Sequence, residues 1–334
     1  MSNAFEPQSA QALVAEAEAA GAALGRVRAE IAKVVFGQER VVELTLAAVL
    51  AGGHGLLVGA PGLAKTRLVE AIAIALGLNW GRVQFTPDLM PADIIGSEIL
   101  DQDQTGRRSF RFAPGPIFTS LLMADEINRA SPRTQSALLQ AMQEGQVTVA
   151  GQHYDLPKPF HVLATQNPIE HEGAYPLPEA QLDRFLLQID VPYPDKETER
   201  RILVDTTGLQ DATPRPVLDA TSLLRIQSLI RQMPVGEKVL ATILELVRSA
   251  RPGASSDPRV NAHVAWGPGP RAGQALMLAV RARALLRGRL APAIDDVIAL
   301  ARPALVHRIS LAFSARGEAI ELESLVDDLA ARAA

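Results

Sequence analysis

Residues 55–66 of this 334-residue chain read GLLVGAPGLAKT, and this stretch decides the fold. A short apolar run at residues 56–58 leads into a glycine-rich turn, and apolar residues at helical spacing follow it. A strand, a tight loop and a helix N-terminus in this order hold a polyphosphate, because loop N–H groups point inward and the helix dipole adds positive potential. The stretch therefore predicts a nucleotide-binding α/β protein.

The loop matches the phosphate-binding pattern Gly-x-x-x-x-Gly-Lys-Ser/Thr at every position but one, where Ala64 stands for the second glycine. We expect the Lys65 ammonium to reach the terminal phosphates of ATP and the Thr66 hydroxyl to bind the accompanying Mg²⁺. The residues predicted to contact the nucleotide in this loop are Gly59, Ala60, Pro61, Gly62, Leu63, Ala64, Lys65, Thr66 and Arg67.

Composition narrows the class of protein. Hydrophobic residues make up 48% and charged residues 21% of the chain, which is typical of a globular protein. The absence of cysteine excludes disulfides and thiolate metal sites. The sequence shows no membrane span and no secretory signal, so we expect a cytoplasmic protein. The six histidines have no metal-ligand spacing and are interpreted as structural.

Charge is uneven along the chain, whose net charge is −4. Residues 221–334 carry 15 Lys and Arg against 10 Asp and Glu, whereas residues 1–220 carry 18 against 27. The basic excess gathers at Arg281, Arg283, Arg287 and Arg289. We interpret this cluster as a solvated helix face rather than a nucleic-acid footprint.

Five short apolar runs alternate with helical segments, which predicts a five-stranded parallel sheet covered on both faces. The expected strands lie within residues 55–58, 82–86, 117–124, 160–165 and 185–190, and the first helices within residues 8–34, 39–51, 66–76 and 131–144. Residues 147–156 are predicted to form a hairpin. Residues 87–116 form either an inserted hairpin, with arms at 94–100 and 107–112, or an ordinary surface loop.

A shift to Pro, Asp and Thr at residues 192–216 indicates a domain junction. We expect a nucleotide-binding α/β core at residues 1–206 and a small all-α domain at residues 207–334.

Polar residues follow two of the predicted strands. Asp125 suits a Mg²⁺ shell, and Glu126 suits polarising an attacking water. Asn167 follows a neighbouring strand and is able to orient the same water. Because ligands bind at the carboxyl ends of parallel strands, we expect these side chains to meet the glycine-rich loop.

The chain resembles the MoxR-type AAA+ ATPases in its signature segments. The segments that carry the resemblance are GAPGLAKT, LLMADEINRASPRTQSALLQAMQE, ATQNP, PEAQLDRF and GPRAGQAL. The resemblance runs from about residue 35 to the C-terminal helices. It implies an AAA+ P-loop core with a helical lid domain, and Mg²⁺-dependent ATP hydrolysis.

The resemblance also implies roles for single residues. Lys65 belongs to Walker A, Asp125 and Glu126 form Walker B, and Asn167 is the sensor-1 residue. Arg184 is the arginine finger that reaches the ATP of a neighbouring subunit, and Arg271 is the sensor-2 arginine of the lid. Residues 87–116 hold the helix-2 insert and residues 147–156 the pre-sensor-1 hairpin. The residues that flank the adenine are Val35, Phe36, Gly37 and Gln38.

Simpler interpretations of the arginines stay open. Arg184 is able to pair with Asp183 or Glu179 on its own surface, and Arg271 is able simply to begin a helix. The sequence does not decide whether Arg129 and Arg133 face a subunit boundary.

Three functions are compatible with these residues. The first is a ring, expected to be a hexamer, that remodels or matures a protein client with a partner carrying a von Willebrand A domain. The second is an AAA+ nucleic-acid motor, which the acidic core disfavours. The third is a scaffold that binds ATP without turnover, which the presence of Asp125, Glu126 and Asn167 disfavours.

Overall fold

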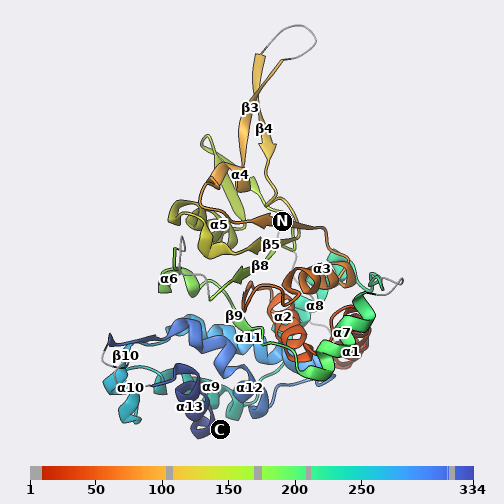
Figure 1. Ribbon diagram of the computed structural model, residues 1–334. Helices are drawn as coiled ribbons and strands as arrows, with labels where there is room; N and C mark the ends of the chain where they lie inside the picture. The colour runs from red at the N-terminus through yellow and green to blue at the C-terminus, as the bar shows by residue number, and fades with distance from the viewer. Residues whose placement is uncertain (1–9, 103–107, 169–174, 208–211, 314, 316–319) are drawn as a thin grey trace.

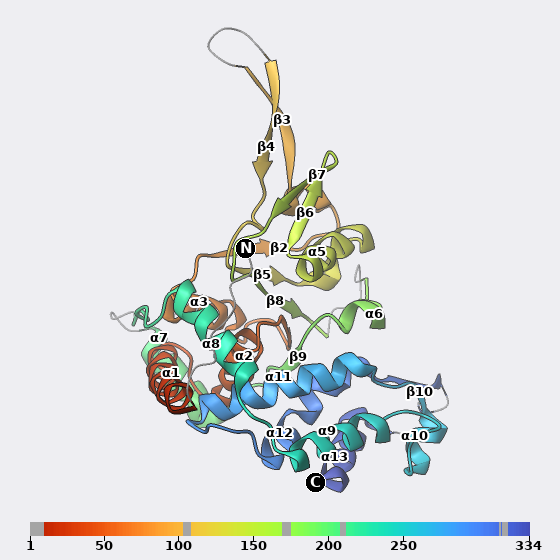
Figure 2. The same cartoon turned by 180° about the vertical axis from the view of Figure 1, so that it is seen from behind.

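The computed structural model describes residues 10–102, 108–168, 175–207, 212–313, 315 and 320–334. A hairpin of β3 (Gly96–Gln102) and β4 (Arg108–Pro114) projects from one end of the molecule, and a layer of helices closes the other end (Figures 1 and 2). A parallel sheet lies between these two ends.

The central sheet has the strand order β2-β5-β8-β1-β9, and every pair of neighbours in it is parallel. This confirms the predicted five-stranded parallel sheet. β5 is buried along its whole length, as expected for a strand covered by helices on both faces. The strands are β1 (Gly55–Val58), β2 (Trp80–Gln84), β5 (Leu121–Asp125), β8 (His161–Gln166) and β9 (Leu187–Asp190).

Two apolar cores cover the two faces of the sheet. Successive side chains of a strand point to opposite faces, so Leu56 packs into one core and Leu57 into the other. The core that contains Leu56 includes Leu138 of helix α5 (Pro132–Glu144). The core that contains Leu57 is larger and takes in the helices α1 (Ala10–Ile31), α2 (Glu39–Leu50) and α3 (Lys65–Ala75).

Local sequence sets the bounds of α5. Ser131 caps its N-terminus, with its hydroxyl accepting from the Thr134 N–H at 3.4 Å, and Pro132 occupies the first turn. Gly145 ends the helix in the left-handed conformation, with φ +64°. These caps confirm the predicted helix at residues 131–144.

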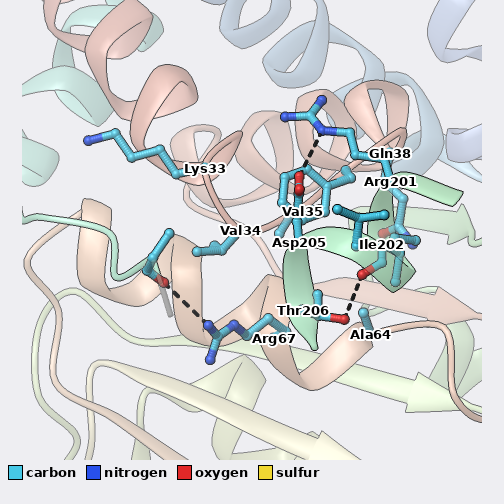
Figure 3. A pocket seen from close by; sticks show the side chains of 13 residues that line it. Lys33, Val34, Val35, Gln38, Ala64, Arg67, Arg201, Ile202, Asp205 and Thr206 are labelled. Atoms are coloured by element: carbon cyan, nitrogen blue, oxygen red, sulfur yellow. Dashed lines mark hydrogen bonds and ion pairs between the residues drawn. The ribbon is translucent and has the colours of Figure 1, made fainter. Parts of the chain in front are cut away.

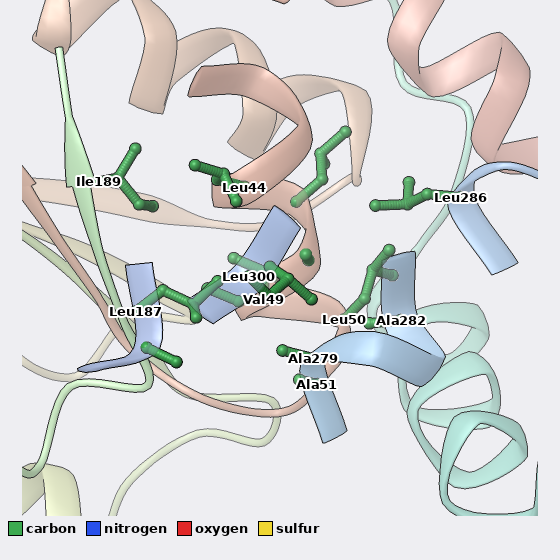
Figure 4. Packing of buried hydrophobic residues seen from close by; sticks show 14 of the residues in the cluster. Leu44, Val49, Leu50, Ala51, Leu187, Ile189, Ala279, Ala282, Leu286 and Leu300 are labelled. Atoms are coloured by element: carbon green, nitrogen blue, oxygen red, sulfur yellow. The ribbon is translucent and has the colours of Figure 1, made fainter. Parts of the chain in front are cut away.

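The C-terminal helices share the larger core with the nucleotide-binding part. Leu300 and Ala279 pack beside Leu44 and Leu187, so helices from both parts of the chain meet at β9 (Figure 4). The helices are α8 (Ala220–Gln232), α9 (Glu237–Ser249), α10 (Pro258–His263), α11 (Pro270–Leu286), α12 (Ile294–Leu305) and α13 (Leu322–Ala333). Within the described residues, none of the helices has the length and apolar character needed to cross a membrane.

Some elements were not anticipated. An eleven-residue helix, α7 (Lys196–Thr206), lies inside the segment taken as a domain junction, and Asp195 caps it by accepting from the Thr198 N–H at 2.8 Å. The helix was not predicted because its sequence is polar, and it buries no residue fully. The C-terminal part also holds a short antiparallel ribbon of β10 (Val264–Trp266) and β11 (Ser310–Leu311), so it is helical but not entirely so.

The arginine cluster in and just after α11 is only in part the solvated face that the sequence suggested, because Arg287 is exposed but Arg283 is not. Arg283 is buried, with its guanidinium 2.5 Å from Asp296 and 3.3 Å from Glu43. Arg287 pairs with Glu43 at 2.7 Å, and Arg289 pairs with Asp296 at 2.6 Å. Glu43 of α2 and Asp296 of α12 therefore pair with three of the four arginines, two of which, Arg287 and Arg289, keep 48% and 36% of their side chains exposed.

Both hairpins above the sheet are present. β3 and β4 pair antiparallel from Gly96–Pro114 to Gln102–Arg108, which settles the alternatives in favour of an inserted hairpin; its tip, residues 103–107, lies outside the described residues. A short helix, α4 (Pro91–Ile95), precedes it. The predicted hairpin at 147–156 is β6 (Gln146–Val149) and β7 (Gln152–Asp155). Phe112 of β4 stacks on Tyr154 of β7 with ring centroids 3.9 Å apart, so the two hairpins contact each other.

Candidate functional site

The glycine-rich loop has the backbone of a phosphate cradle. It leaves β1 at Gly59 and enters α3 at Lys65. Gly62 has φ +82°, and Ala64, which caps α3, has φ +54° and ψ +24°. Ala64 therefore adopts the left-handed conformation that the usual glycine adopts freely, at a steric cost of about 1–2 kcal/mol. The departure from the sequence pattern leaves the loop geometry in place.

Lys65 lies folded across this loop. Its ammonium donates to the carbonyl oxygen of Gly59 at 2.6 Å and to that of Ala60 at 2.9 Å. Burial lowers the pKa of Lys65, and the charges of Asp125 and Glu126 oppose that shift. The two carboxylates at the end of β5 therefore act on the same ammonium, so they lie near the glycine-rich loop.

Thr165 of β8 fixes both acidic residues. Its hydroxyl donates to the Asp125 carboxylate at 2.6 Å and accepts from the Glu126 N–H at 2.8 Å. The guanidinium of Arg82, on β2, donates to the other Asp125 oxygen at 2.6 Å. Thr165 and Arg82 were missed in the sequence, since only strand pairing brings them to Asp125.

Glu126 has its own polar neighbours. It adopts the left-handed conformation, with φ +56° and ψ +51°. Its carboxylate accepts from the Gln84 amide at 2.8 Å and from the Arg129 guanidinium at 3.0 Å. Arg129 thus binds Glu126 of its own chain. Arg133, in contrast, lines a separate hollow with Met90 and Thr148.

Asn167 is buried directly after β8. β8 lies between β5 and β1, so its carboxyl end brings Asn167 between Asp125 and the glycine-rich loop. Gly59 N–H donates to the Gln166 carbonyl at 3.2 Å, which ties the loop to β8. The predicted phosphate, water and metal residues therefore come together at one edge of the sheet.

A pocket of about 880 Å³ opens beside the loop (Figure 3). Val35, Phe36 and Gln38 line it together with Ala64 and Arg67, and the Gln38 amide donates to the Leu63 carbonyl at 3.2 Å. These residues, which the sequence analysis predicted to bind the nucleotide, line one pocket that is large enough for a nucleotide.

Helix α7 forms the other wall of this pocket. Arg201 lies over the Phe36 ring, 4.4 Å from its centroid, and Ile202 and Thr206 also line the space. A side chain at Gly37 would lie 2.4 Å from Thr198 of α7, so the close approach needs a glycine there. The contact between Arg201 and Phe36 shows that α7 belongs to the pocket. No spacing in the sequence indicates this contact, so α7 was not predicted as part of the site.

The donor set suits magnesium held with a nucleotide. Thr66 in the first turn of α3 and Asp125 at the end of β5 offer one hydroxyl and one carboxylate, and Mg²⁺ commonly takes one or two carboxylates with substrate phosphates and water. Among the described residues, no group of three or more His, Asp and Glu side chains is able to hold a metal alone. Thr66 and Asp125 would therefore bind Mg²⁺ only together with the phosphates.

Arg184 lies away from this pocket. It follows the short helix α6 (Glu179–Leu182), and its guanidinium donates to the Leu139 carbonyl of α5. Its Nε is buried and has no hydrogen-bond partner. It pairs neither with Asp183 nor with Glu179, so the local surface pairing considered from the sequence is wrong.

Arg271 lies beside Arg184 and not at the glycine-rich loop. It begins α11 and approaches Asp183 to 3.7 Å. Arg184 and Arg271 line one hollow of about 250 Å³, together with Asp183, His54 and Arg308. We call this group (Asp183, Arg184, Arg271 and Arg308) the arginine side, and the pocket with residues 59–67, Asp125, Glu126 and Asn167 the nucleotide side. Helix α7, on the nucleotide side, and α6, on the arginine side, lie on opposite sides of the molecule (Figures 1 and 2).

Comparison with known proteins agrees with this geometry. The ATPase family associated with various cellular activities (AAA) matches residues 54–187, and the AAA lid domain matches residues 256–329. The chain is 41% identical to Chaperone MoxR1 of Mycobacterium tuberculosis over 96% of this chain and 83% of that protein. It is 35% identical to Protein MoxR of Methylorubrum extorquens, covering 86% of this chain and 88% of that one. A crystallised candidate ATPase of Cytophaga hutchinsonii superimposes with a TM-score of 0.89 at 35% identity, covering 97% and 98% of the two chains.

Proposed function

This chain belongs to the MoxR family of AAA+ ATPases and hydrolyses ATP, and from that premise we propose that its active sites form between the subunits of a ring. One observation carries this proposal. Arg184 and Arg271 lie together, yet neither lines the pocket beside the glycine-rich loop of its own chain. A second copy placed head to tail would bring one subunit's arginine side to its neighbour's nucleotide side.

The residues of the nucleotide side have separate tasks in this proposal. Lys65 and the N–H groups of the loop hold the phosphates, which requires the ammonium to leave the carbonyl oxygens it now binds. Thr66 and Asp125 bind Mg²⁺, which screens phosphate charge. Glu126 accepts a proton from the attacking water, and Asn167 orients that water.

The arginine side supplies positive charge where the reaction develops negative charge. Arg184 of the neighbouring subunit neutralises the charge that grows on the transferred phosphoryl group, a role worth about 10³–10⁵ in rate in other phosphoryl-transfer enzymes. Arg271, from the lid, acts on the same developing charge. Hydrolysis then depends on assembly.

We also propose that the work done is chaperone-like remodelling or maturation of a protein client. The chaperone name of a relative that is 41% identical supports this reading. The partner with a von Willebrand A domain, the hexameric ring and the cytoplasmic location, where ATP is supplied, belong to the same proposal. The ion pairs of Arg283, Arg287 and Arg289 with carboxylates of the same chain weigh against the nucleic-acid motor, because they reduce the positive charge that this cluster offers to phosphates.

The test is the ATP hydrolysis rate as a function of protein concentration, for the unchanged protein and for Glu126→Gln and Arg184→Ala. We expect the rate per chain to rise with concentration. Both variants should lose hydrolysis by about 10³-fold or more while still binding ATP. A rate per chain that stays flat, with Arg184→Ala active, would show that each chain hydrolyses ATP alone.

A further inference from the structure

Arg308 is a buried arginine that none of the tasks above uses. It ends the 3-10 helix η2 (Val306–Arg308), which follows α12, and only 3% of its side chain is exposed. Burying a guanidinium costs several kcal/mol unless its hydrogen bonds are satisfied, so its partners indicate what it does.

Each N–H of the Arg308 guanidinium can be matched with an acceptor. Nε donates to the Asp183 carboxylate at 2.7 Å. Nη2 donates to the carbonyl oxygens of Phe185 at 2.7 Å and Asp183 at 3.3 Å. Nη1 donates to the carbonyl oxygen of Leu186 at 3.2 Å and to that of Ala304 in α12. A guanidinium has five donors, so this set uses its whole capacity.

Four of these five acceptors belong to residues 183–186, the segment that carries Arg184. The carbonyl groups on both sides of Arg184, those of Asp183 and Phe185, bind the same guanidinium. His307 adds a contact of 3.1 Å from its Nε2 to the Phe185 carbonyl. The backbone at Arg184 is therefore held by two neighbouring side chains that come from the C-terminal helices.

Asp183 links Arg308 to Arg271. One carboxylate oxygen accepts from Arg308 at 2.7 Å, and the other lies 3.7 Å from the Arg271 guanidinium. The C-terminal helices thus reach the segment of Arg184 at two points, through η2 and through the start of α11. A movement of these helices would carry Arg184 with it.

An apolar residue of similar volume would fill this space without the cost of a buried charge. Such a residue would leave the carbonyl oxygens of Asp183, Phe185 and Leu186 with fewer partners. The segment would keep the hydrogen bonds of its own turn but would lose most of its polar contacts with the C-terminal helices. The contribution of the guanidinium is therefore to hold the backbone of residues 183–186 in its observed conformation.

We propose that Arg308 is a positioning residue for hydrolysis in the neighbouring subunit: it fixes Arg184 against the lid, so that Arg184 and Arg271 reach the neighbour's nucleotide as one unit. This inference rests on the proposed role of Arg184 between subunits. It assigns Arg308 no contact with nucleotide.

The experiment mixes two variant subunits. Arg308→Met keeps its own nucleotide side but is expected to misplace Arg184, so that its hydrolysis rate falls about 10²-fold while its ATP affinity changes less than about twofold. Glu126→Gln keeps its arginine side but does not hydrolyse ATP. In an equal mixture, about a quarter of the interfaces join an intact nucleotide side to an intact arginine side, so the rate should rise to about a quarter of that of the unchanged protein.

Arg283→Met is the matched control, because Arg283 is an equally buried arginine of the C-terminal helices that lies away from Arg184. It should lose thermal stability while keeping most of its hydrolysis rate per folded chain. Mixing it with Glu126→Gln should lower that rate by about half, because no interface is repaired.

Arg308→Lys replaces Arg308→Met in the mixing experiment if Arg308→Met does not fold. Its three N–H donors are too few for the segment, so the same rise on mixing should follow a smaller initial loss.

Arg184→Ala mixed with Glu126→Gln separates the two ideas. If this mixture regains activity and the Arg308 mixture does not, Arg308 is only structural and the inference is wrong while the proposed function stands. If neither mixture regains activity, Arg184 does not act between subunits, and both the proposed function and the inference on Arg308 are wrong. A full hydrolysis rate in Arg308→Met alone would also overturn the inference.

Discussion

The nucleotide side and the arginine side are built over different distances in the sequence. Lys65 binds the carbonyl oxygens of residues five and six positions before it, and the glycine-rich loop needs only twelve consecutive residues. Four of the five acceptors of Arg308 instead belong to residues 122 to 125 positions away. A local motif therefore makes one side, whereas the packing of the C-terminal helices makes the other, and the second is the side that a change in those helices would move.

The largest expected difference between the sides is in what each contributes to ATP binding. Lys65→Ala should lower ATP affinity by about 10–100-fold, because charged hydrogen bonds of this kind are worth about 1.5–3 kcal/mol. Arg271→Ala should leave affinity within about twofold and lower the maximal hydrolysis rate by about 10-fold or more. Binding of a fluorescent ATP analogue and steady-state hydrolysis measure the two quantities separately. If Arg271→Ala lowers ATP affinity as strongly as Lys65→Ala does, Arg271 contacts the nucleotide of its own chain.

Acid should destabilise the folded protein through two buried histidines that lie next to the arginine side. Burial, assisted by the charge of His161, lowers the pKa of His54 to about 3, and burial also holds the pKa of His307 well below its usual range. The unfolded chain binds protons at these residues near pH 6.5, so stability is complete above that pH and is lost as pH falls below it. For His54 alone the loss at pH 5 is about 2 kcal/mol.

Urea unfolding at pH 7, 6 and 5 measures this loss, and His54→Gln provides the control. The His54 ring accepts from the Val162 N–H at 3.0 Å and lies 3.2 Å from the Met142 carbonyl, and an amide is able to replace both contacts without titrating. The variant should therefore lose less stability on acidification. An unchanged pH dependence would show that His54 does not control it.

The smallest expected effect concerns the nucleotide side. Ala64→Gly should raise the free energy of unfolding by about 0.5–1 kcal/mol or leave it unchanged, because glycine relieves the positive φ of +54° but gains freedom in the unfolded chain. Thermal unfolding without nucleotide measures this change, and Ala73→Gly, inside α3, should destabilise instead. Equal destabilisation by both changes would mean that residue 64 carries no strain.

Much of the nucleotide side was predictable because it depends on neighbours in sequence. The strand, loop and helix at residues 55–66 follow from one apolar run, glycines and a lysine, and the caps of α5 follow from Ser131 and Gly145. Parallel pairing then brings Asp125 and Asn167 to that loop, since every strand of such a sheet ends at the same edge.

The sequence by itself determined the parallel sheet, the phosphate loop and the acidic pair, because periodicity, turns and strand order are local or follow from a single rule of topology. Only the tertiary structure placed α7 against Phe36, paired Arg283 with Asp296, and brought Arg271 and Arg308 to Asp183, beside Arg184. The physical reason is that an arginine carries its charge on a long, flexible side chain. Its partner is chosen by which helices pack together, and a single sequence does not display that packing.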